Sequence, residues 1–139
     1  MNYLLDTHCI AWFFTGRHDL LPDDVVDDLL YYGNNYAVSE MSIVELFQLR
    51  QVGRLDLVQR PTELRNNLEY MNMEILPVTT RTMEVFCDLP QPAFNDGRHT
   101  DPFDRIIIAT AINYGRTLIS HDRRFPYYAE HADLSLLEI

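Results

Sequence analysis

The stretch that decides the fold is residues 102–120, PFDRIIIATAINYGRTLIS. Its first part predicts an apolar helix over Pro102–Tyr114, opened by a proline and stopped by Gly115. A short strand with a β-branched start, Thr117–Ile119, follows at once. A helix that leads directly into a strand is the repeating unit of folds in which helices and strands alternate along the sequence. The stretch therefore predicts a parallel sheet covered by helices.

The remainder of the chain alternates in the same way. Further strands are expected at Asn2–Leu5, Tyr36–Val38, Glu74–Val78 and Leu134–Leu137. Further helices are expected at Thr7–Phe14, Pro22–Tyr32, Ser42–Val52, Pro61–Met71 and Thr80–Cys87, and residues 89–101 are expected to form a loop. We find no internal repeat and no linker, so residues 1–139 are expected to form one domain. Its expected fold class is α/β, a three-layer α/β/α sandwich with a central parallel sheet.

Length and composition agree with a single globular domain. A chain of 139 residues with 47% hydrophobic residues is long enough to bury a core and is not typical of a disordered protein. The apolar runs are too short for a membrane span, and Asp6 and His8 interrupt the start of the chain where a signal peptide would be apolar. A cytoplasmic location is expected. Cys9 and Cys87 fit no metal or redox spacing and are expected to be free thiols.

The charge balance is strongly acidic. Acidic residues number 21 against 11 basic ones, which gives a net charge of −10, and every basic residue is an arginine. This charge argues against non-specific attraction to nucleic acid. It leaves room for an enzyme whose acidic site binds cations that in turn bind phosphate. The use of arginine alone suits bidentate phosphate contacts, or reflects a compositional bias.

Four carboxylates are expected at the carboxyl edge of the sheet, where sheets of this kind bind ligands. Asp6 ends the first strand, and Asp122 follows the strand at Thr117–Ile119. Glu45 is expected in the first turn of the helix after the second strand. Asp104 is expected in the first turn of the helix over Pro102–Tyr114. That helix is roughly 18 Å long, so it begins at the edge where the next strand ends.

Each of these acids also has a purely structural interpretation. Asp6 is placed to cap the following helix, and Asp122 to cap the turn before Phe125. Ser42 and Glu45 match a capping box. Asp101, Pro102 and Asp104 match a helix cap, a first-position proline and an acid that faces the helix dipole. For each acid considered alone, the structural interpretation is favoured.

The four acids together favour a metal site. Clustered carboxylates repel one another and their pKa values rise unless a cation neutralises them. Hard oxygen ligands select Mg²⁺ or Mn²⁺, and such ions at a carboxylate edge are typical of sites that cleave phosphodiesters.

Four blocks of the sequence resemble one known family. They are Leu4–His8 with Trp12, Ser39–Leu55 with Ser42 and Glu45, His99–Arg105 continuing to Ala111, and Leu118–Asp122 with Phe125. In this order and spacing the chain resembles the PIN-domain ribonucleases, specifically the VapC type of toxin from bacterial toxin–antitoxin pairs. The resemblance covers nearly the whole chain.

The resemblance implies an α/β/α sandwich, usually a homodimer, that hydrolyses RNA with Mg²⁺ or Mn²⁺ and is held inactive by a cognate antitoxin. By resemblance, Asp6 and Asp104 are the central metal ligands and catalytic residues, and Glu45 and Asp122 complete the catalytic and metal-binding set. Accessory or substrate-binding roles are implied for Asp101, Arg105, Thr7 and Ser120. Two features depart from the family pattern: the segment 91–98 before His99 is long, and Ser120 stands where threonine is common.

Several nearby residues have two interpretations each. His8, His99 and His121 flank the acidic positions and either bind a softer metal, support the site or simply lie on the surface, the last two being favoured. Trp12 either packs in the core or dimer interface or stacks on a base. Arg123 and Arg124 either hold an RNA phosphate or neutralise the acids. The sequence assigns no role to Tyr31, Tyr32, Tyr127 or Tyr128.

Two other function classes remain open. A phosphatase of the haloacid-dehalogenase class uses an aspartate after the first strand as nucleophile, but repeats the aspartate two residues on, where this chain has His8. A non-catalytic PIN-fold binding module is the other alternative. A pure binding module has no need of all four acids, so an enzyme is the favoured prediction.

Overall fold

Five parallel strands form the middle layer of the molecule, in the order β3-β2-β1-β6-β7. The structure is a computed structural model and describes residues 2–31 and 35–139. The strands are β1 (Tyr3–Leu5), β2 (Tyr36–Ser39), β3 (Glu74–Leu76), β6 (Thr117–Ser120) and β7 (Leu136–Glu138). In the central strand, Leu5 pairs with Val38 of β2 on one side and with Ile119 of β6 on the other. The predicted parallel sheet is confirmed.

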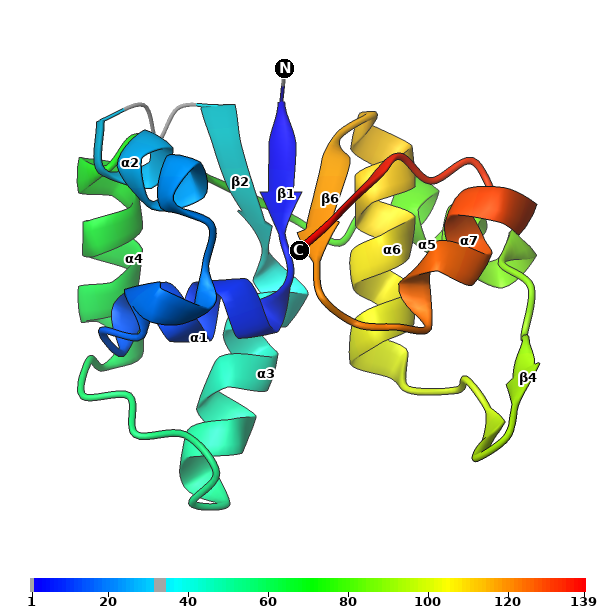
Figure 1. The fold of residues 1–139 in the computed structure, drawn as a ribbon, viewed down its shortest axis with the longest axis horizontal. Helices are drawn as coiled ribbons and strands as arrows, with labels where there is room; N and C mark the ends of the chain where they lie inside the picture. Colours follow the sequence, from blue (N-terminus) through cyan, green and yellow to red (C-terminus); the bar gives the residue numbers. More distant parts are fainter. Residues whose placement is uncertain (1, 32–34) are drawn as a thin grey trace.

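Helices cover both faces of this sheet, which confirms the predicted three layers (Figure 1). One face is covered by α1 (Thr7–Phe14), α2 (Asp23–Tyr31), α3 (Glu40–Gln51) and α4 (Pro61–Tyr70). The other is covered by α5 (Thr80–Asp88), α6 (Pro102–Tyr114) and α7 (Phe125–His131). None of the helices within residues 2–31 and 35–139 is long and apolar enough to cross a membrane.

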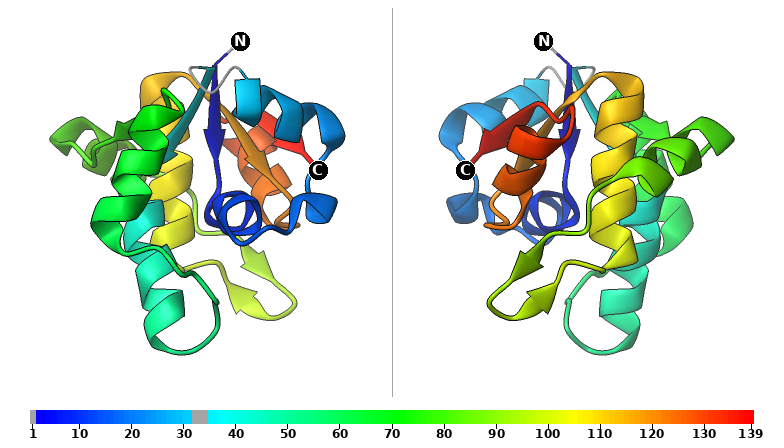
Figure 2. Two further views of the ribbon diagram at one scale, coloured as in Figure 1. Left: turned by 90° about the vertical axis from the view of Figure 1, so that its left-hand side faces the viewer. Right: turned by 90° about the vertical axis from the view of Figure 1, so that its right-hand side faces the viewer.

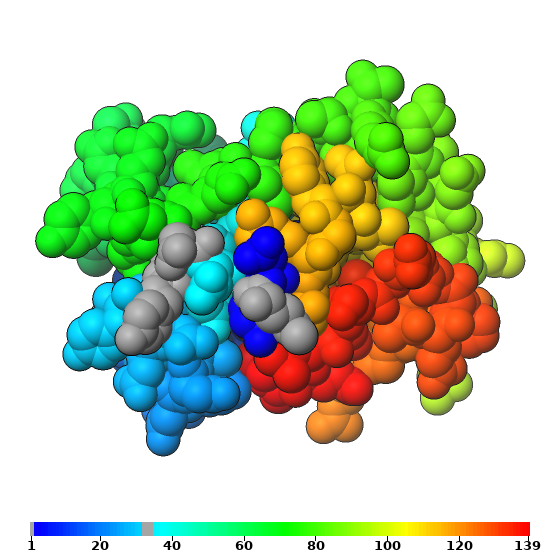
Figure 3. Space-filling view, turned by 90° about the horizontal axis from the view of Figure 1, so that it is seen from above, coloured from blue at the N-terminus to red at the C-terminus, as the bar shows by residue number. Residues whose placement is uncertain are grey.

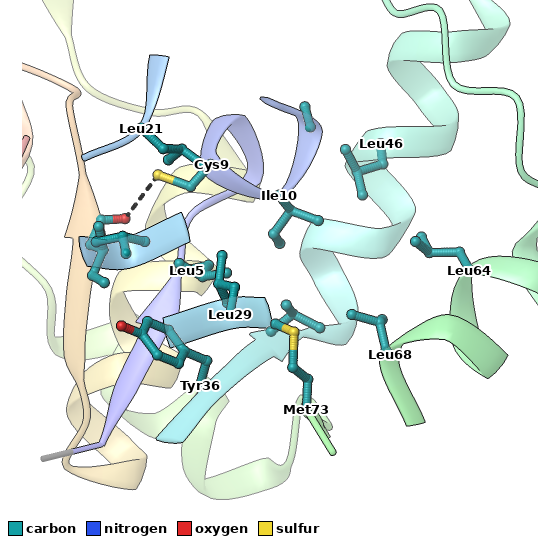
Figure 4. Packing of buried hydrophobic residues seen from close by; sticks show 14 of the residues in the cluster. Leu5, Cys9, Ile10, Leu21, Leu29, Tyr36, Leu46, Leu64, Leu68 and Met73 are labelled. Carbon is teal, nitrogen blue, oxygen red and sulfur yellow. Dashed lines mark hydrogen bonds between the residues drawn. The ribbon is translucent and has the colours of Figure 1, made fainter. Parts of the chain in front are cut away.

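The strands alternate their side chains between two hydrophobic cores, as a sheet buried on both faces requires. Leu5 and Val38 pack on one face, and Leu4 and Ala37 pack on the other. Figure 4 shows the first core, in which the thiol of Cys9 points to the backbone oxygen of Ile119. The first-face residues in this view include Leu5, Ile10, Leu29, Leu64, Leu68 and Met73.

The helix α6 begins and ends where the sequence predicts. Asp101 accepts hydrogen bonds from the backbone N–H groups of Phe103 (2.9 Å) and Asp104 (3.3 Å), and Pro102 occupies the first turn, so the predicted cap is confirmed. At the other end Gly115 adopts a left-handed conformation with φ of 63°, which glycine accommodates without a Cβ clash. This helix therefore runs its full length beside the sheet.

Several predicted boundaries were wrong. Helix α3 begins at Glu40 because Ser39, not Ser42, is its cap and accepts a hydrogen bond from the N–H of Met41. Strand β3 stops at Leu76, and β7 lies two residues after the predicted start at Leu134. The last residue of the predicted helix Pro22–Tyr32 lies outside the described residues, and the helix itself spans Asp23–Tyr31.

Three features of the fold were not predicted. Helix α7 follows β6, and a hairpin of β4 (Ala93–Phe94) and β5 (Gly97–Arg98) occupies the predicted loop 89–101. The hairpin lies at the same end of the molecule as the start of α6 (Figure 2). A short 3-10 helix, His18–Leu20, also joins α1 to α2.

The carboxyl edge of the sheet is the lower end of the molecule in Figure 1, where the strand arrows point and where α1, α3 and α6 begin. Figure 3 views the opposite end, where the first residues of β1 lie beside the end of α6. The residues expected to carry the chemistry therefore lie on the side of the molecule away from the view in Figure 3.

Candidate active site

Asp6 and Asp122 are held at the carboxyl edge by one shared serine. Asp6 follows β1 and Asp122 follows β6, and these two strands are neighbours in the sheet. The hydroxyl of Ser120 donates a hydrogen bond to Oδ2 of Asp6 and accepts one from the N–H of Asp122 at 3.0 Å. Ser120 is 1% exposed, so this link is shielded from water. The departure from threonine leaves the hydroxyl in place.

Asp6 also caps the start of α1, and Asp122 caps the turn before Phe125. Oδ1 of Asp6 accepts a hydrogen bond from the N–H of Cys9 at 3.0 Å at the start of α1. Oδ1 of Asp122 accepts one from the N–H of Arg124 at 2.8 Å. The predicted capping interactions are confirmed, and they fix where each carboxylate sits without excluding a second role.

Glu45 lies one turn further along α3 than predicted, because the helix begins at Glu40. The predicted capping box is wrong: Ser42 is buried inside the helix, where its hydroxyl accepts a hydrogen bond from Thr7 at 3.2 Å. Instead, Oε1 of Glu45 is buried and has no hydrogen-bond partner among the described residues. A buried carboxylate oxygen without a partner is costly, which marks it as a place for a cation or a proton.

The environment of Glu45 raises its pKa. Burial is the largest cause, and the negative charges of Asp104 and Asp101 raise the pKa further, while the Thr7 hydroxyl and His8 lower it. Glu45 is therefore close enough to the start of α6 to be affected by the acids there. Helices α3 and α6 are also in contact, so a site shared by their acids stays a prediction that the packing allows.

Asp104 occupies the first turn of α6, as predicted. Its pKa is raised, first by burial and then by the negative charges of Asp101 and Asp122, while a hydrogen bond from His99 lowers it. The negative charge of Asp122, which follows β6, thus raises the pKa of Asp104. The negative charge of Asp104 in turn raises the pKa of Glu45 in α3. Four segments distant in sequence bring acids to this edge, and we call Asp6, Glu45, Asp104 and Asp122 the acidic site.

The donor set of the acidic site fits a divalent metal ion, although the side chains do not already enclose one. No three His, Cys, Asp or Glu side chains are arranged as a ligand group in the described part of the chain. Oε1 of Glu45 has no hydrogen-bond partner among the described residues, and burial together with neighbouring carboxylates raises the pKa values of Glu45 and Asp104. A bound cation would offset both effects. Carboxylate oxygens are the ligands that Mg²⁺ and Mn²⁺ prefer. The sharing of one ion by all four acids stays a prediction.

Arg105 is buried below the site and does not face solvent. Its guanidinium donates hydrogen bonds to the backbone oxygens of Pro90 (2.7 Å) and Leu89 (3.4 Å) and to the hydroxyl of Tyr128 (3.0 Å). It also lies over the ring of Phe86, 5.5 Å from its centre. These contacts tie the segment before the hairpin to α6 and α7, which is a supporting position.

The structure gives Tyr128 a place that sequence reasoning missed. Its hydroxyl also lies 2.9 Å from Nδ1 of His99, whose Nε2 is 3.1 Å from Oδ2 of Asp104. The available signal was the apolar spacing of Phe125 and Tyr128, both buried in the second core. That spacing indicates a helix but says nothing about a hydroxyl that reaches the site.

The remaining candidates lie around the acidic site. Trp12, His8 and His121 form an aromatic group, with the rings of Trp12 and His121 4.8 Å apart. Arg124 pairs with Asp96 of the hairpin at 3.3 Å and Arg123 is exposed. Both predicted free thiols are confirmed, with Cys9 buried and Cys87 exposed.

Comparison with known proteins gives one family and a set of similar folds. The family model described as PIN domain matches residues 3–131. No curated protein sequence matches the chain. Among solved structures, VapBC2 of Rickettsia felis bound to a DNA fragment from its promoter is 19% identical, with 100% of this chain and 99% of that chain covered and a TM-score of 0.68.

Two further solved structures are similar over nearly their whole length. VapBC-1 from nontypeable Haemophilus influenzae is 18% identical, with 99% of this chain and 98% of that chain covered and a TM-score of 0.65. VapBC-5 from Mycobacterium tuberculosis is 19% identical with the same coverage and a TM-score of 0.63. At these identities the comparison establishes a shared fold.

Proposed function

The chain belongs to the PIN domain family, and on this premise we propose that it is a metal-dependent endoribonuclease, the toxin of a toxin–antitoxin pair. The observation that carries the proposal is the buried oxygen of Glu45, without a hydrogen-bond partner among the described residues, next to the acids that begin α6 and follow β6. Glu45 lies inside α3 and caps no helix, so capping does not account for this carboxylate at the acidic edge.

Asp6, Glu45, Asp104 and Asp122 would hold Mg²⁺ or Mn²⁺. Such an ion supplies a water of lowered pKa and stabilises the negative charge that develops on phosphate during hydrolysis. The chain's own residues set the geometry: Ser120 fixes Asp6 relative to Asp122, and Thr7 lies beside Glu45. Asp101 caps the start of α6 and so places Asp104, and its charge adds to the attraction for cations.

The proposed partners are an RNA substrate and a cognate antitoxin. The solved structures with a similar fold include VapBC2 of Rickettsia felis, VapBC-1 of Haemophilus influenzae and a toxin–antitoxin complex from Klebsiella pneumoniae. A net charge of −10 disfavours RNA binding by general attraction, so cations at the acidic site would contribute to substrate affinity. We place the protein in the cytoplasm, as a homodimer.

Cleavage of RNA in the presence of Mg²⁺ or Mn²⁺ tests the proposal. Asp6→Asn and Asp104→Asn keep the shape of each side chain and remove its charge, and we expect both to abolish cleavage. Asp88→Asn changes an exposed acid at the end of α5 and serves as the matched control. Equal cleavage by wild type and both site variants would reject the proposal.

The alternatives make different predictions. A haloacid-dehalogenase-like phosphatase would form an aspartyl-phosphate at Asp6, but Oδ1 and Oδ2 of Asp6 both accept hydrogen bonds and the residue is 4% exposed. A non-catalytic PIN-fold module would bind its partner and show no affinity for Mn²⁺ in calorimetry. Calorimetric titration of the wild type with Mn²⁺ therefore separates the nuclease from the binding module.

A further inference from the structure

A continuous chain of buried hydrogen bonds ends on the carboxylate of Asp104. Arg105 lies 3.0 Å from the hydroxyl of Tyr128, that hydroxyl lies 2.9 Å from Nδ1 of His99, and Nε2 of His99 lies 3.1 Å from Oδ2 of Asp104. The side chain of His99 is 0% exposed, whereas that of Asp104 is 20% exposed. The chain thus runs from the interior to the surface of the acidic site.

The donors and acceptors fix the direction of this chain. A guanidinium only donates, so the Tyr128 oxygen accepts from Arg105. The Tyr128 hydroxyl then has its own hydrogen to place, and Nδ1 of His99 is the acceptor within reach. Nδ1 therefore carries no hydrogen, and the ring carries it on Nε2, where it is donated to Asp104. Every member of the chain has a partner, as a buried polar network requires.

The surroundings of His99 are largely aromatic, so its two ring nitrogens depend on Tyr128 and Asp104 for hydrogen bonds. Its ring is packed among the rings of Phe94, Phe125 and Tyr128, with centroids 6.4, 6.2 and 5.6 Å away. An apolar side chain would fill that space without needing partners for two ring nitrogens. The imidazole adds a fixed donor aimed at one oxygen of Asp104.

We propose that His99 is a positioning residue that orients Asp104 in the acidic site, and that Tyr128 and Arg105 hold His99 in the required tautomer. This inference rests on the proposed function, since it assigns the series of hydrogen bonds from Arg105 to Asp104 to the same site. The hydrogen bond occupies Oδ2 of Asp104 and leaves Oδ1 available to a divalent cation. It also opposes rotation of the carboxylate away from the site under repulsion from Asp101 and Asp122.

The hairpin segment encloses this arrangement. The backbone N–H of His99 donates to the oxygen of Pro92 at 3.0 Å, and Arg105 is held by the carbonyls that precede the hairpin. Phe94 of β4 packs on both His99 and Tyr127. The long segment before α6 therefore covers the hydrogen bonds of His99 and Arg105 and shields them from water.

The imidazole nitrogen chemical shifts of the wild-type protein, measured by NMR, test the donor and acceptor assignment of these hydrogen bonds without any variant. We expect His99 to be the tautomer with hydrogen on Nε2 and none on Nδ1, with slow exchange of that hydrogen. A hydrogen on Nδ1, or rapid exchange with water, would overturn the proposal. This result does not depend on RNA cleavage.

Calorimetric binding of Mn²⁺ to four variants tests the positioning role. Changes to groups that hydrogen-bond metal ligands typically cost about 10–100-fold in metal affinity, and we expect such a loss for His99→Leu and a similar loss for Tyr128→Phe. His99→Gln places an amide N–H near the position of Nε2 and should recover part of the affinity. Tyr127→Phe, next to the chain but outside it, is the matched control and should bind Mn²⁺ as wild type does.

The outcomes separate this inference from the proposed function. Equal Mn²⁺ affinity of wild type and Tyr128→Phe, or no recovery in His99→Gln when His99→Leu loses affinity, would overturn the positioning role while wild-type cleavage stands. Absence of Mn²⁺ binding by the wild type itself would reject the proposed function and the positioning role together, even with the expected tautomer in place.

Discussion

Replacement of Arg105 by methionine measures how strongly the segment before the hairpin is fixed to the site. Methionine keeps an unbranched apolar stem but removes every donor, so the carbonyls of Leu89 and Pro90 and the hydroxyl of Tyr128 lose a partner. The contacts at 2.7 and 3.0 Å have good lengths, whereas the one at 3.4 Å is near the limit of a hydrogen bond. Two hydrogen bonds from a buried charged group give an expected loss of about 3–6 kcal/mol. That is a large part of the stability of an ordinary domain, about 5–15 kcal/mol.

Urea unfolding of the metal-free protein is the assay. With a slope of about 2 kcal/mol per M, a loss of about 4 kcal/mol lowers the midpoint by about 2 M. Arg81→Met changes an exposed arginine on α5 and should leave the midpoint unchanged. A loss below about 1 kcal/mol in Arg105→Met would refute the claim that these contacts hold the segment in place.

Three further predictions concern the site and its surroundings. Burial and nearby acids raise the pKa of Glu45 in the folded protein. The protonated side chain therefore favours the folded state at low pH, and this stabilisation is lost as pH rises from the usual carboxyl pKa through the raised pKa. Glu45→Gln should therefore melt at a higher temperature than wild type at pH 7 without metal, and the difference should vanish near pH ~4; a lower melting temperature at pH 7 would contradict this. Ser120→Ala should weaken Mn²⁺ binding about tenfold in calorimetry while Ser120→Thr keeps it, because the hydroxyl holds Asp6; equal affinities would count against the link. Burial raises the pKa of the Cys9 thiol, so a thiol-specific disulfide reagent should modify only Cys87 in the folded protein and both cysteines in urea; early modification of Cys9 would show that the first core is open.

The elements that sequence reasoning located well are those whose ends carry local signals. Helix α6 has a capping aspartate, a first-turn proline and a left-handed glycine at its end, and its bounds are as predicted. Helix α1 likewise begins after a capping acid, Asp6. In these segments the side chains next to the helix ends make the hydrogen bonds that decide the boundary.

The elements that were missed depend on distant contacts. Helix α7 has no side-chain cap at Arg124 and spans only seven residues, so burial of Phe125 and Tyr128 in the second core stabilises it. The hairpin strands have two residues each, and the only local signal is the turn at Asn95–Gly97. The hairpin also makes two long-range contacts, in which Phe94 packs on His99 and Asp96 pairs with Arg124. A pattern of hydrophobic residues along the sequence predicts neither contact.

The candidate site shows the same division. That the acids belong at one edge follows from strand order and direction, which the alternation of elements predicts. The wrong start of α3 came from two serines three residues apart, Ser39 and Ser42, of which only the second is followed by a glutamate at the capping-box distance. Tyr128 was missed because it meets His99 across 29 positions of sequence, and no spacing rule covers such a contact.

The most direct test of the account is to locate Mn²⁺ by its anomalous scattering in crystals of the wild-type protein. The account predicts an ion at coordination distance, about 2.2 Å, from carboxylate oxygens of both Asp6 and Asp104, with Glu45 and Asp122 turned toward it. An ion bound elsewhere, or carboxylates that stay apart in saturating Mn²⁺, would contradict it.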